Sequence, residues 1–490
     1  MSLAKAENIL LVIADDFGVD AVGVYSRDDL YGHDGEGASP AHTPTIDNLA
    51  ASGVLFRNAY TNPICSPTRA TILTGKYPHQ VGVGFPVEAQ LEVSETIIPE
   101  ILPSSYQTAA IGKWHLTHPS RGASADRNHP IHSGFDYFSG SLGGAVRDYN
   151  SWPKVTNSSS TSLQVQNNYN IYATTDAANE TIAKIEEYAD QPWFIWLAFH
   201  APHTPFHAPD PALTTNDVTA TSSNTEKYKA MVEAMDTELG RIIASMPVAV
   251  LADTTIIFIG DNGTPSSVTQ APFLPNHAKA TQYDGGINVP FIVRSPSIIS
   301  TADEGSESLA YIAAIDIFNT IAEIAGVNND ATESATESVS LVPYLQNPSL
   351  PTMAQRPYIF TEHFQPNGLG PYTNHQRAMH LDKWKIIWRD NVFEEFFDLS
   401  SDPFETNNLL PLTNLTTEQL AIYDQLVCAF EGIDTLGSTD PSDIINPSSC
   451  MPSAIEEVPT VPVIWRLLLG SLFIGVFVSK SRFWQPQSPL

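Results

Sequence analysis

The chain has 490 residues, 42% of them hydrophobic and 10% aromatic, so it can bury a core and is not a disordered chain. Its 24 basic and 54 acidic residues leave a formal net charge of −30, and so acidic a surface argues against a nucleic-acid partner. An anionic small substrate would need a local cluster of the scarce cations, and the length allows two or three domains or one large α/β domain with an appendage.

The first residues bear on where the protein is located. Met1 to Glu7 lack the apolar core of a signal peptide, yet Ala4-Lys5-Ala6 resembles the small-x-small end of a cleaved one. We therefore expect an exported protein, periplasmic or at the cell surface. In this view the native signal peptide is missing from the sequence, and Met1 to Leu3 stand in its place.

Three short apolar runs predict central strands of a sheet. They are Asn8 to Ala14, Trp193 to Phe199 and Thr254 to Gly260, and each ends abruptly at polar residues. Continuous rather than alternating hydrophobicity is typical of strands that are covered on both faces. Because ligands bind beyond the carboxyl ends of the strands in such sheets, we expect the polar residues that follow these runs to converge.

Helices are predicted between these strands. Thr43-Pro44 is typical of an N-cap followed by proline at the first helical position, and Gly53 ends that helix. From Tyr228 to Met246 apolar residues recur every three or four positions, which predicts an amphipathic helix just before the third strand. Strands alternating with helices indicate an α/β fold, with a large mixed, mostly parallel sheet sandwiched between helices.

The later part of the chain predicts smaller units. Leu381 to Leu399 has the pattern of antiparallel strands, so we divide the chain into an α/β domain at 5–360 and a smaller C-terminal antiparallel α+β subdomain at 361–440. A Pro/Ser-rich linker is expected at 441–460, and a hydrophobic tail with a basic end at 461–482. The tail either tethers the protein to a membrane, which its basic end favours, or is a bacterial sorting tail or a buried terminal helix.

The three cysteines are Cys65, Cys428 and Cys450, too few for a disulfide scaffold and without zinc-finger spacing. Cys428 and Cys450 lie near one another in the sequence and could pair in an oxidising compartment. Cys65 would then be left alone, so its role has to be explained separately.

Carboxylates follow two of the predicted strands. Asp15 and Asp16 follow the first, and Asp261 and Asn262 follow the third. Alone, Asp-Asp is more often a solvated turn and Asp-Asn-Gly a tight turn, but two such groups at the ends of central strands favour a metal site. Three carboxylates and one amide oxygen suit Ca²⁺ or Mg²⁺ rather than a soft metal.

The most informative segment is Cys65-Ser66-Pro67-Thr68-Arg69-Ala70-Thr71-Ile72-Leu73-Thr74-Gly75. A lone Cys-x-Pro indicates only a buried cysteine beside a proline turn, but eleven residues together are far more specific. They resemble the signature of the type I, formylglycine-dependent sulfatase family of the alkaline phosphatase superfamily, with Thr68 in place of the commoner serine. The resemblance implies that a formylglycine-generating maturation enzyme oxidises Cys65 to an aldehyde, which is hydrated to a geminal diol.

Further blocks support this resemblance in the same order along the chain, over roughly residues 8 to 410. Two of them depart from the family pattern, with Ser105 where glycine is usual and Asp284 where glutamate is usual. The first departure touches the turn before a strand and not the Lys and His of its block. The blocks are Tyr106–His115, the family's active-site lysine at Lys279, Tyr283–Pro290, and the C-terminal strand and turn at Phe397–Glu405.

The resemblance selects Ca²⁺ as the metal held by the four oxygen ligands, with Mg²⁺ as the alternative. A sulfate ester is anionic and poorly electrophilic, so its oxygens must be neutralised and the line of attack fixed. Lys113, Lys279 and the metal are the cations suited to this, while Arg69 would orient the modified side chain and the metal carboxylates. An isolated Lys or Arg would by default be a solvated surface group.

The mechanism that the resemblance implies begins when one hydroxyl of the diol attacks sulfur in line. His203 or Lys279 then protonates the leaving alcohol, and the second hydroxyl, deprotonated with help from His115, expels sulfate and regenerates the aldehyde. His203 is preferred to His200 because it matches the family's Pro-His-x-Pro position. The simpler alternatives are a turn histidine at 203 and a satisfied buried histidine at 115.

We therefore expect a sulfatase, a sulfuric ester hydrolase with a monomeric core, that acts on a sulfated carbohydrate and accepts aryl sulfates as surrogates. One alternative is a phosphodiesterase or phosphonate monoester hydrolase of the same superfamily, which faster phosphodiester turnover would reveal. Another is a catalytically dead protein that binds sulfated glycans, which would carry Cys65 as an unmodified thiol.

Overall fold

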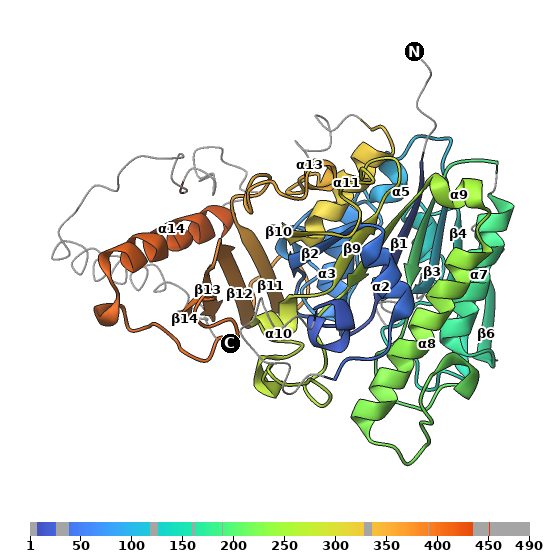
Figure 1. Ribbon diagram of the computed structural model, residues 1–490, viewed down its shortest axis with the longest axis horizontal. Coiled ribbons are helices and arrows are strands. Elements are labelled where there is room, and N and C mark those ends of the chain that lie inside the picture. The colour runs from blue at the N-terminus through green and yellow to red at the C-terminus, as the bar shows by residue number, and fades with distance from the viewer. Residues whose placement is uncertain are drawn as a thin grey trace, which may run out of the picture.

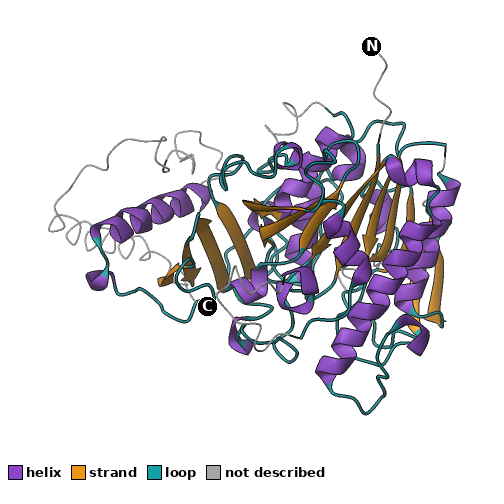
Figure 2. Cartoon of the chain, viewed as in Figure 1, coloured by secondary structure: helices purple, strands orange, loops and turns teal. Residues whose placement is uncertain are grey.

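The computed structural model describes residues 7–25, 39–117, 126–158, 162–188, 190–327, 336–390, 392–434 and 450. These residues form two sheets with helices around them (Figures 1 and 2). The larger sheet has ten strands in the order β10-β2-β9-β8-β1-β7-β3-β4-β5-β6. Their bounds are β1 Asn8–Ala14, β2 Val54–Tyr60, β3 Gln107–Lys113, β4 Tyr137–Ser141, β5 Trp152–Asn157, β6 Gln164–Tyr169, β7 Trp193–Ala198, β8 Thr254–Gly260, β9 Phe291–Arg294 and β10 Ser306–Ala313.

The centre of this sheet is parallel. β8, β1, β7 and β3 are neighbours that run in one direction, with Ala14 paired to Gly260 and Ile13 to Ala198. β9 is antiparallel to both of its neighbours, and β5 is antiparallel to β4 and β6. The mixed, mostly parallel sheet of the sequence analysis is therefore confirmed, and the carboxyl ends of the four central strands lie at one edge.

Alternate residues of β1 pack into different hydrophobic clusters, one on each face of the sheet. Ile9, Leu11 and Ile13 share a cluster with residues of α3 (Cys65–Thr74), α5 (Ile98–Ile101) and α11 (Ile317–Ile324). Leu10, Val12 and Ala14 share another with α2 (Pro44–Ala51), α7 (Ala173–Glu187) and α8 (Asn224–Ser245), and Figure 1 shows α7 and α8 side by side. Burial on both faces explains the uninterrupted apolar run of this strand.

The remaining short helices are α4 Pro78–Val81, α6 His129–His132, α9 Val248–Ala252, α10 Asp284–Ile287 and α13 Val342–Gln346.

The first turn of α2 is capped differently from the prediction. Pro44 is its first residue as expected, but the side chain of Thr43 makes no capping hydrogen bond and donates instead to Asp47 Oδ1 at 3.3 Å. The carboxylate of Asp236, from α8, accepts from the backbone N–H groups of Thr45 at 2.9 Å and Ile46 at 2.8 Å. A charged acceptor from the neighbouring helix therefore does the work expected of Thr43.

The second sheet is antiparallel, in the order β11-β12-β13-β14, and α14 (Thr417–Asp434) packs on β12 and β13. Its strands are β11 Ile359–Gln365, β12 Asn374–Leu381, β13 Trp384–Arg389 and β14 Val392–Asp398, which confirms the antiparallel pattern predicted between Leu381 and Leu399. β11 contains the position at which we divide the chain, and the division at residue 360 stays a proposal.

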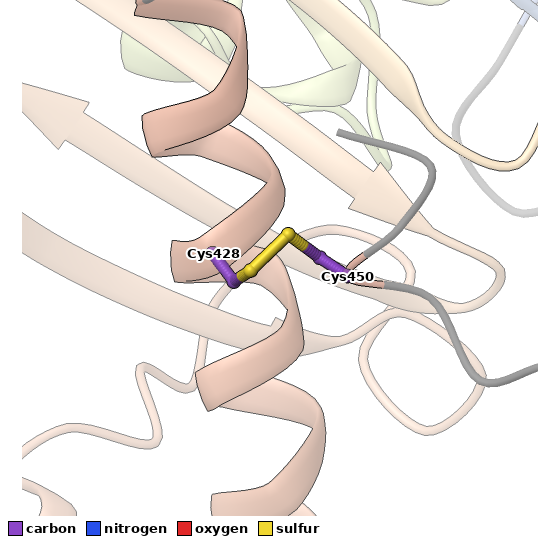
Figure 3. The surroundings of a disulfide bond; sticks show 2 residues. All are labelled: Cys428 and Cys450. Atoms are coloured by element: carbon purple, nitrogen blue, oxygen red, sulfur yellow. A yellow bond between two sulfur atoms is a disulfide. The ribbon is translucent and has the colours of Figure 1, made fainter. Parts of the chain in front are cut away.

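Cys428, in α14, forms a disulfide with Cys450, which confirms the expected pairing and leaves Cys65 as a free, buried cysteine (Figure 3). In the described part of the chain, no helix combines the length and the apolar character that crossing a membrane requires. The expected signal-peptide remnant at 4–6, the linker at 441–460 apart from Cys450, and the tail at 461–482 lie outside the described residues.

Candidate active site

Polar side chains from the carboxyl ends of four strands and the start of one helix meet at one edge of the large sheet. Asp15 and Asp16 follow β1, Lys113 ends β3, and Cys65 begins α3. All ten residues that the sequence analysis singles out lie in one connected set of contacts. They are Asp15, Asp16, Cys65, Arg69, Lys113, His115, His203, Asp261, Asn262 and Lys279.

The four oxygen-bearing residues form an acidic cluster that is almost completely buried. Asp15, Asp261 and Asn262 have no exposed surface, and Asp16 is 1% exposed. Asp16 accepts from Asn262 Nδ2 at 2.9 Å, and the backbone N–H of Asp16 donates to Asp261 Oδ1 at 3.0 Å. Burial, reinforced by repulsion from Asp261, raises the pKa of Asp15 to about 6 despite the attraction of Lys113.

Two oxygens of this cluster have no hydrogen-bond partner among the described residues, namely Asp15 Oδ1 and Asn262 Oδ1. Buried acceptors without donors are costly, and three crowded carboxylates repel one another. A hard divalent cation would remove both penalties because oxygen atoms are its preferred ligands. The residues present therefore fit a metal ion of this class.

Cys65 lies beside both the acidic cluster and a histidine. Its Sγ is 3.2 Å from His115 Nδ1, and Sγ and single carboxylate oxygens of Asp15 and Asp261 all lie within 4.8 Å of one another. Burial raises the pKa of the Cys65 thiol, so the unmodified side chain is held neutral and is a poor nucleophile. Burial, together with Lys113 and Arg69, lowers the pKa of His115 well below its ordinary value, so its ring is a neutral proton acceptor.

Three cations surround the acidic cluster. Arg69 donates from Nε and Nη2 to Asp261 Oδ2 at 3.0 and 2.8 Å, and from Nη1 to the carbonyl of Lys113 at 2.9 Å. Lys113 Nζ contacts Asp15 Oδ2 at 2.6 Å, and Lys279 Nζ contacts Asp16 Oδ1 at 2.5 Å. Burial opposes ionisation of Asp16, but Lys279 and the other cations outweigh it and hold the pKa of Asp16 below its usual range. These three side chains therefore form a local cluster of positive charge in a chain whose formal net charge is −30.

The two histidines after β7 differ in accessibility. The His203 side chain is 16% exposed, with Nε2 3.8 Å from Asp16 Oδ2, whereas His200 is 2% exposed with no hydrogen-bond partner for either ring nitrogen among the described residues. His203 Nδ1 lies 2.7 Å from the carbonyl of Thr204, which can only accept, so Nδ1 carries a proton. Nε2 is therefore the nitrogen of His203 that can exchange a proton with a ligand.

Three non-glycine residues at the site adopt left-handed backbone conformations, Asp16 with φ 66°, His115 with φ 59° and Ala280, next to Lys279, with φ 72°. Such conformations cost roughly 1–3 kcal/mol each and persist only when the surroundings impose them. The backbone N–H of each residue donates a hydrogen bond, and the acceptors are Asp261 Oδ1, Leu142 O and Pro63 O. The fold thus holds these side chains in fixed directions.

Several residues that support the site from behind were not predicted from the sequence. The Tyr149 hydroxyl lies 2.6 Å from the carbonyl of His200 and 2.7 Å from that of His203. Tyr228, whose helix was predicted but whose role was not, donates to the carbonyl of Asp16 at 2.8 Å. Gly144 lies so close to His115 that an added Cβ would be 2.2 Å from the ring. These residues touch backbone or ring surfaces and belong to no catalytic pattern, so only the structure identifies them.

Comparison with known proteins assigns the family. A family model described as Sulfatase matches residues 7–327, well over half of the chain. The chain belongs to the sulfatase family. It is therefore an enzyme of the alkaline phosphatase superfamily and a sulfuric ester hydrolase. A second model, described as N-sulphoglucosamine sulphohydrolase, C-terminal, matches residues 276–429 and so reaches from Lys279 into α14.

Individual sulfatases are similar over most of their length. N-acetylgalactosamine-6-sulfatase of Homo sapiens is 28% identical over 423 residues, covering 78% of this chain and 73% of the human protein. The ulvan-active sulfatase of Formosa agariphila is 26% identical over 397 residues, with coverages of 77% and 74%. The structure of Ps i-CgsB in complex with k-i-k-neocarrahexaose superposes with a TM-score of 0.68 at 23% identity, covering 96% and 100%, and that likeness concerns the fold alone.

Proposed function

We propose that this sulfatase hydrolyses sulfate esters of a carbohydrate, with Cys65 converted to formylglycine and Ca²⁺ bound by Asp15, Asp16, Asp261 and Asn262. The observation that carries the proposal is the position of Cys65. Its Sγ lies 3.2 Å from a histidine nitrogen and within 4.8 Å of carboxylate oxygens from two different strand ends. A buried thiol with a raised pKa has no evident use there unless it is modified.

The carbohydrate half of the substrate is inferred from the relatives. One acts, by its name, on N-acetylgalactosamine-6-sulfate, one is active on ulvan, and a structural neighbour was solved with a neocarrahexaose. All three ligands are saccharides. We therefore infer a sulfated sugar as the natural substrate and use aryl sulfates as convenient test compounds.

Binding and orientation of the sulfate group are assigned to the cations. Lys113, which is buried, and Lys279, whose side chain is 19% exposed, lie beside the acidic cluster and can neutralise sulfate oxygens. Arg69 bridges Asp261 and the carbonyl of Lys113, so it fixes the relative positions of an acidic ligand and a cationic one. A bound Ca²⁺ would supply further positive charge for the sulfate and would satisfy the orphaned oxygens of Asp15 and Asn262.

Proton transfers are assigned to three residues. The hydrated aldehyde supplies two hydroxyl groups on one carbon, one for attack on sulfur and the other for release of sulfate. His115 Nδ1, 3.2 Å from the position of Sγ, is the group that accepts a proton from this side chain. His203 Nε2 and Lys279 Nζ both face Asp16, at 3.8 and 2.5 Å, and are the candidates that give a proton to the leaving alcohol.

The decisive experiment combines mass spectrometry with turnover. Trypsin releases Cys65 in the peptide Asn58–Arg69, and conversion of the thiol to the aldehyde lowers the mass of that peptide. We expect the modified mass in enzyme that has met the maturation enzyme, release of inorganic sulfate from 4-nitrophenyl sulfate, and a loss of about 10⁴-fold or more in Cys65→Ala. Undiminished activity in Cys65→Ala would refute the mechanism. Faster turnover of bis(4-nitrophenyl) phosphate than of the sulfate would favour a phosphodiesterase instead.

We also infer that the protein is exported. The support is the Cys428–Cys450 disulfide, because disulfides form and persist mainly outside the reducing cytosol. Fractionation of the producing cell, with reduced and non-reduced mass measurements of the peptides that contain Cys428 and Cys450, tests this directly. A cytosolic protein with both thiols free would contradict it.

A further inference from the structure

The segment 142–149 connects the two histidines of the site. At its start, the carbonyl of Leu142 accepts from the backbone N–H of His115 at 3.2 Å, and Gly144 lies against the His115 ring with no room for a Cβ. At its end, the Tyr149 hydroxyl contacts the carbonyls of His200 and His203. The segment is therefore anchored on both sides of the reaction centre.

Arg147 is an exposed, positively charged residue of this anchored segment, and its side chain has no partner among the described residues. It is exposed, while Val146 before it is 1% exposed and Tyr149 after it is 2% exposed, so the backbone on either side is held in place. No ion pair or hydrogen bond joins the Arg147 side chain to another described residue. The adjacent Asp148 accepts from the backbone N–H of Asn150 at 2.8 Å and forms no ion pair with Arg147.

Arg147 has no described carboxylate partner, a property it shares with the exposed Arg127, but Arg147 lies on a segment that is anchored beside both histidines of the site. Acidic residues outnumber basic ones by 54 to 24, and most described cations have a carboxylate partner, including the exposed Arg241, which bonds Glu238. Arg241 and Arg147 are thus both exposed, but of the two only Arg241 has a carboxylate partner among the described residues. A guanidinium offers a planar, forked set of donors that matches carboxylate and sulfate oxygens.

Arg147 lies close in the sequence to a residue that touches the site. Arg147 is three positions after Gly144, so their Cα atoms are at most about 11 Å apart. Gly144 touches His115, and His115 touches Cys65. These links place the backbone of Arg147 close to the side of the site that His115 forms, and Arg147 is not itself among the groups that contact Cys65.

We propose that Arg147 binds a second anionic group of the substrate, a sulfate or carboxylate on the same sugar or the next one, and thereby selects polyanionic saccharides. This inference rests on the proposed sulfatase activity toward carbohydrates and adds a specificity determinant to it. The chemistry needed is a bidentate interaction between the guanidinium and two oxygens of one anionic group. No covalent step is involved.

The test measures competition rather than turnover of the sugar, so it does not depend on finding the natural substrate. A disulfated disaccharide and its monosulfated counterpart each compete with 4-nitrophenyl sulfate in wild type, Arg147→Gln, Arg147→Lys and Arg241→Gln. Arg241 is the charge-matched control, about 20 Å along α8 from Tyr228, which contacts Asp16. A carboxylated monosulfated disaccharide distinguishes a carboxylate from a second sulfate.

In the wild type we expect tighter inhibition by the disulfated or carboxylated sugar than by the monosulfated one. Arg147→Gln should reduce this preference about tenfold, whereas Arg147→Lys should retain part of it. Added salt should also reduce the preference. Arg241→Gln should keep the full preference. Equal inhibition by all sugars in the wild type, or an unchanged preference in Arg147→Gln, would overturn the inference. Failure of the wild type to hydrolyse 4-nitrophenyl sulfate would instead count against the proposed function.

Discussion

Asn262 uses only one of its two side-chain polar atoms in hydrogen bonds to the described residues. Its Nδ2 donates to Asp16 Oδ1 at 2.9 Å and to the carbonyl of Gly263 at 3.1 Å. Its Oδ1 is buried and has no donor among the described residues. The amide is thus held so that only its oxygen is available, which is the arrangement a Ca²⁺ ligand requires.

We expect Ca²⁺ to stabilise the wild type against heat and Asn262→Ala to weaken that effect. A ligand that binds only the folded state adds about 2.7 kcal/mol to the unfolding free energy at 100 times its dissociation constant. Thermal unfolding of chelator-treated protein with increasing Ca²⁺ measures the shift, and calorimetric titration measures the affinity. Asn347→Ala, an exposed asparagine, is the control. Identical shifts in Asn262→Ala and the wild type would contradict the assignment.

Tyr149 is a positioning residue, and we expect Tyr149→Phe to slow the reaction most for poor leaving groups. Loss of the hydroxyl frees the carbonyls of His200 and His203, so Nε2 of His203 is held less firmly where an alcohol needs a proton. Nitrophenol leaves without much help, whereas an alkyl alcohol does not. Rates of a series of aryl and alkyl sulfates should therefore depend more steeply on leaving-group pKa, with roughly a tenfold loss at the alkyl end.

The matched control is Tyr106→Phe, which removes a buried hydroxyl that donates to the carbonyl of Glu7 at 2.7 Å. Tyr106 precedes β3, whereas Lys113 ends that strand, so the two positions are about 20 Å apart. A merely structural contribution of Tyr149 would lower stability in both variants and leave the dependence on the leaving group unchanged. That result would show that Tyr149 does not position His203 for the reaction.

At the residue scale, prediction succeeds where a side chain belongs to a dense local pattern. Cys65 and Arg69 share one eleven-residue segment, and Asp15 and Asp261 each follow a recognisable strand. Tyr149 has no such context, because its partners are two backbone carbonyls 51 and 54 residues away. Any residue can offer a carbonyl, so the sequence does not mark this contact.

At the scale of elements, burial decides what the sequence predicts. β1 and β8 have the bounds that their apolar runs indicate, because every residue in each strand is buried. The predicted end of the run at Phe199 is one residue beyond β7, although its N–H still bonds the carbonyl of Ile13. The cap of α2 could not be predicted, because Asp236 lies 190 residues from Ile46 in the sequence.

Glu362, in β11, contacts His79 of α4 and His375 of the neighbouring strand β12, and so joins the second sheet to α4. Its Oε1 accepts from Nδ1 of His79 at 2.7 Å and from the backbone N–H of His79 at 2.9 Å, and its Oε2 lies 2.7 Å from Nε2 of His375. Burial disfavours the charged carboxylate, but His79 and His375 outweigh it and hold the pKa of Glu362 below its usual range. The cluster therefore adds polar contacts to the packing of Phe360, in β11, against His79 of α4.

We expect Glu362→Gln to destabilise the protein and to flatten the acid side of its stability profile. An unfolded glutamate titrates near a pKa of about 4.3, above the folded value, so the carboxylate's contribution is fully present above about pH 4.3 and is lost as the pH falls below it. The unfolding free energy at pH 6 should fall by about 3 kcal/mol.

Urea unfolding between pH 6 and 3 measures both effects. Glu187→Gln, whose carboxylate is 60% exposed beside Lys184, is the control and should change little. An equally steep loss of stability with acid in Glu362→Gln and the wild type would show that the lowered pKa of Glu362 does not contribute.

At the scale of the whole molecule, the two sheets share a hydrophobic cluster. Tyr60 at the end of β2 and Tyr311 in β10 belong to the same cluster as Phe396 in β14 and Phe430 in α14. A buried charged group adds to this contact, because Lys385 in β13 bonds both Asp284 Oδ1 at 2.7 Å and Glu405 Oε1 at 2.6 Å. The second sheet is therefore packed against the first and not merely connected to it by the chain.

This shared core bears on the disulfide, because Cys428 lies in the helix that completes it. Closing the loop between Cys428 and Cys450, with a sequence separation of 22, is expected to contribute about 3 kcal/mol through restriction of the unfolded chain. We expect the double variant Cys428→Ser/Cys450→Ser to unfold in one transition at a lower temperature. The reason is that detachment of α14 would expose the hydrophobic cluster that both sheets share.

Scanning calorimetry distinguishes this outcome from separate unfolding of the C-terminal unit. One transition that moves down as a whole means that the two sheets unfold together, and sulfatase activity should then decay at the same temperature as the heat absorption. Two transitions, an early one for the C-terminal unit and a late one at the wild-type temperature, would contradict cooperative unfolding. Mild reduction of the wild type should reproduce the behaviour of the double variant, because Cys65 is buried and belongs to no disulfide.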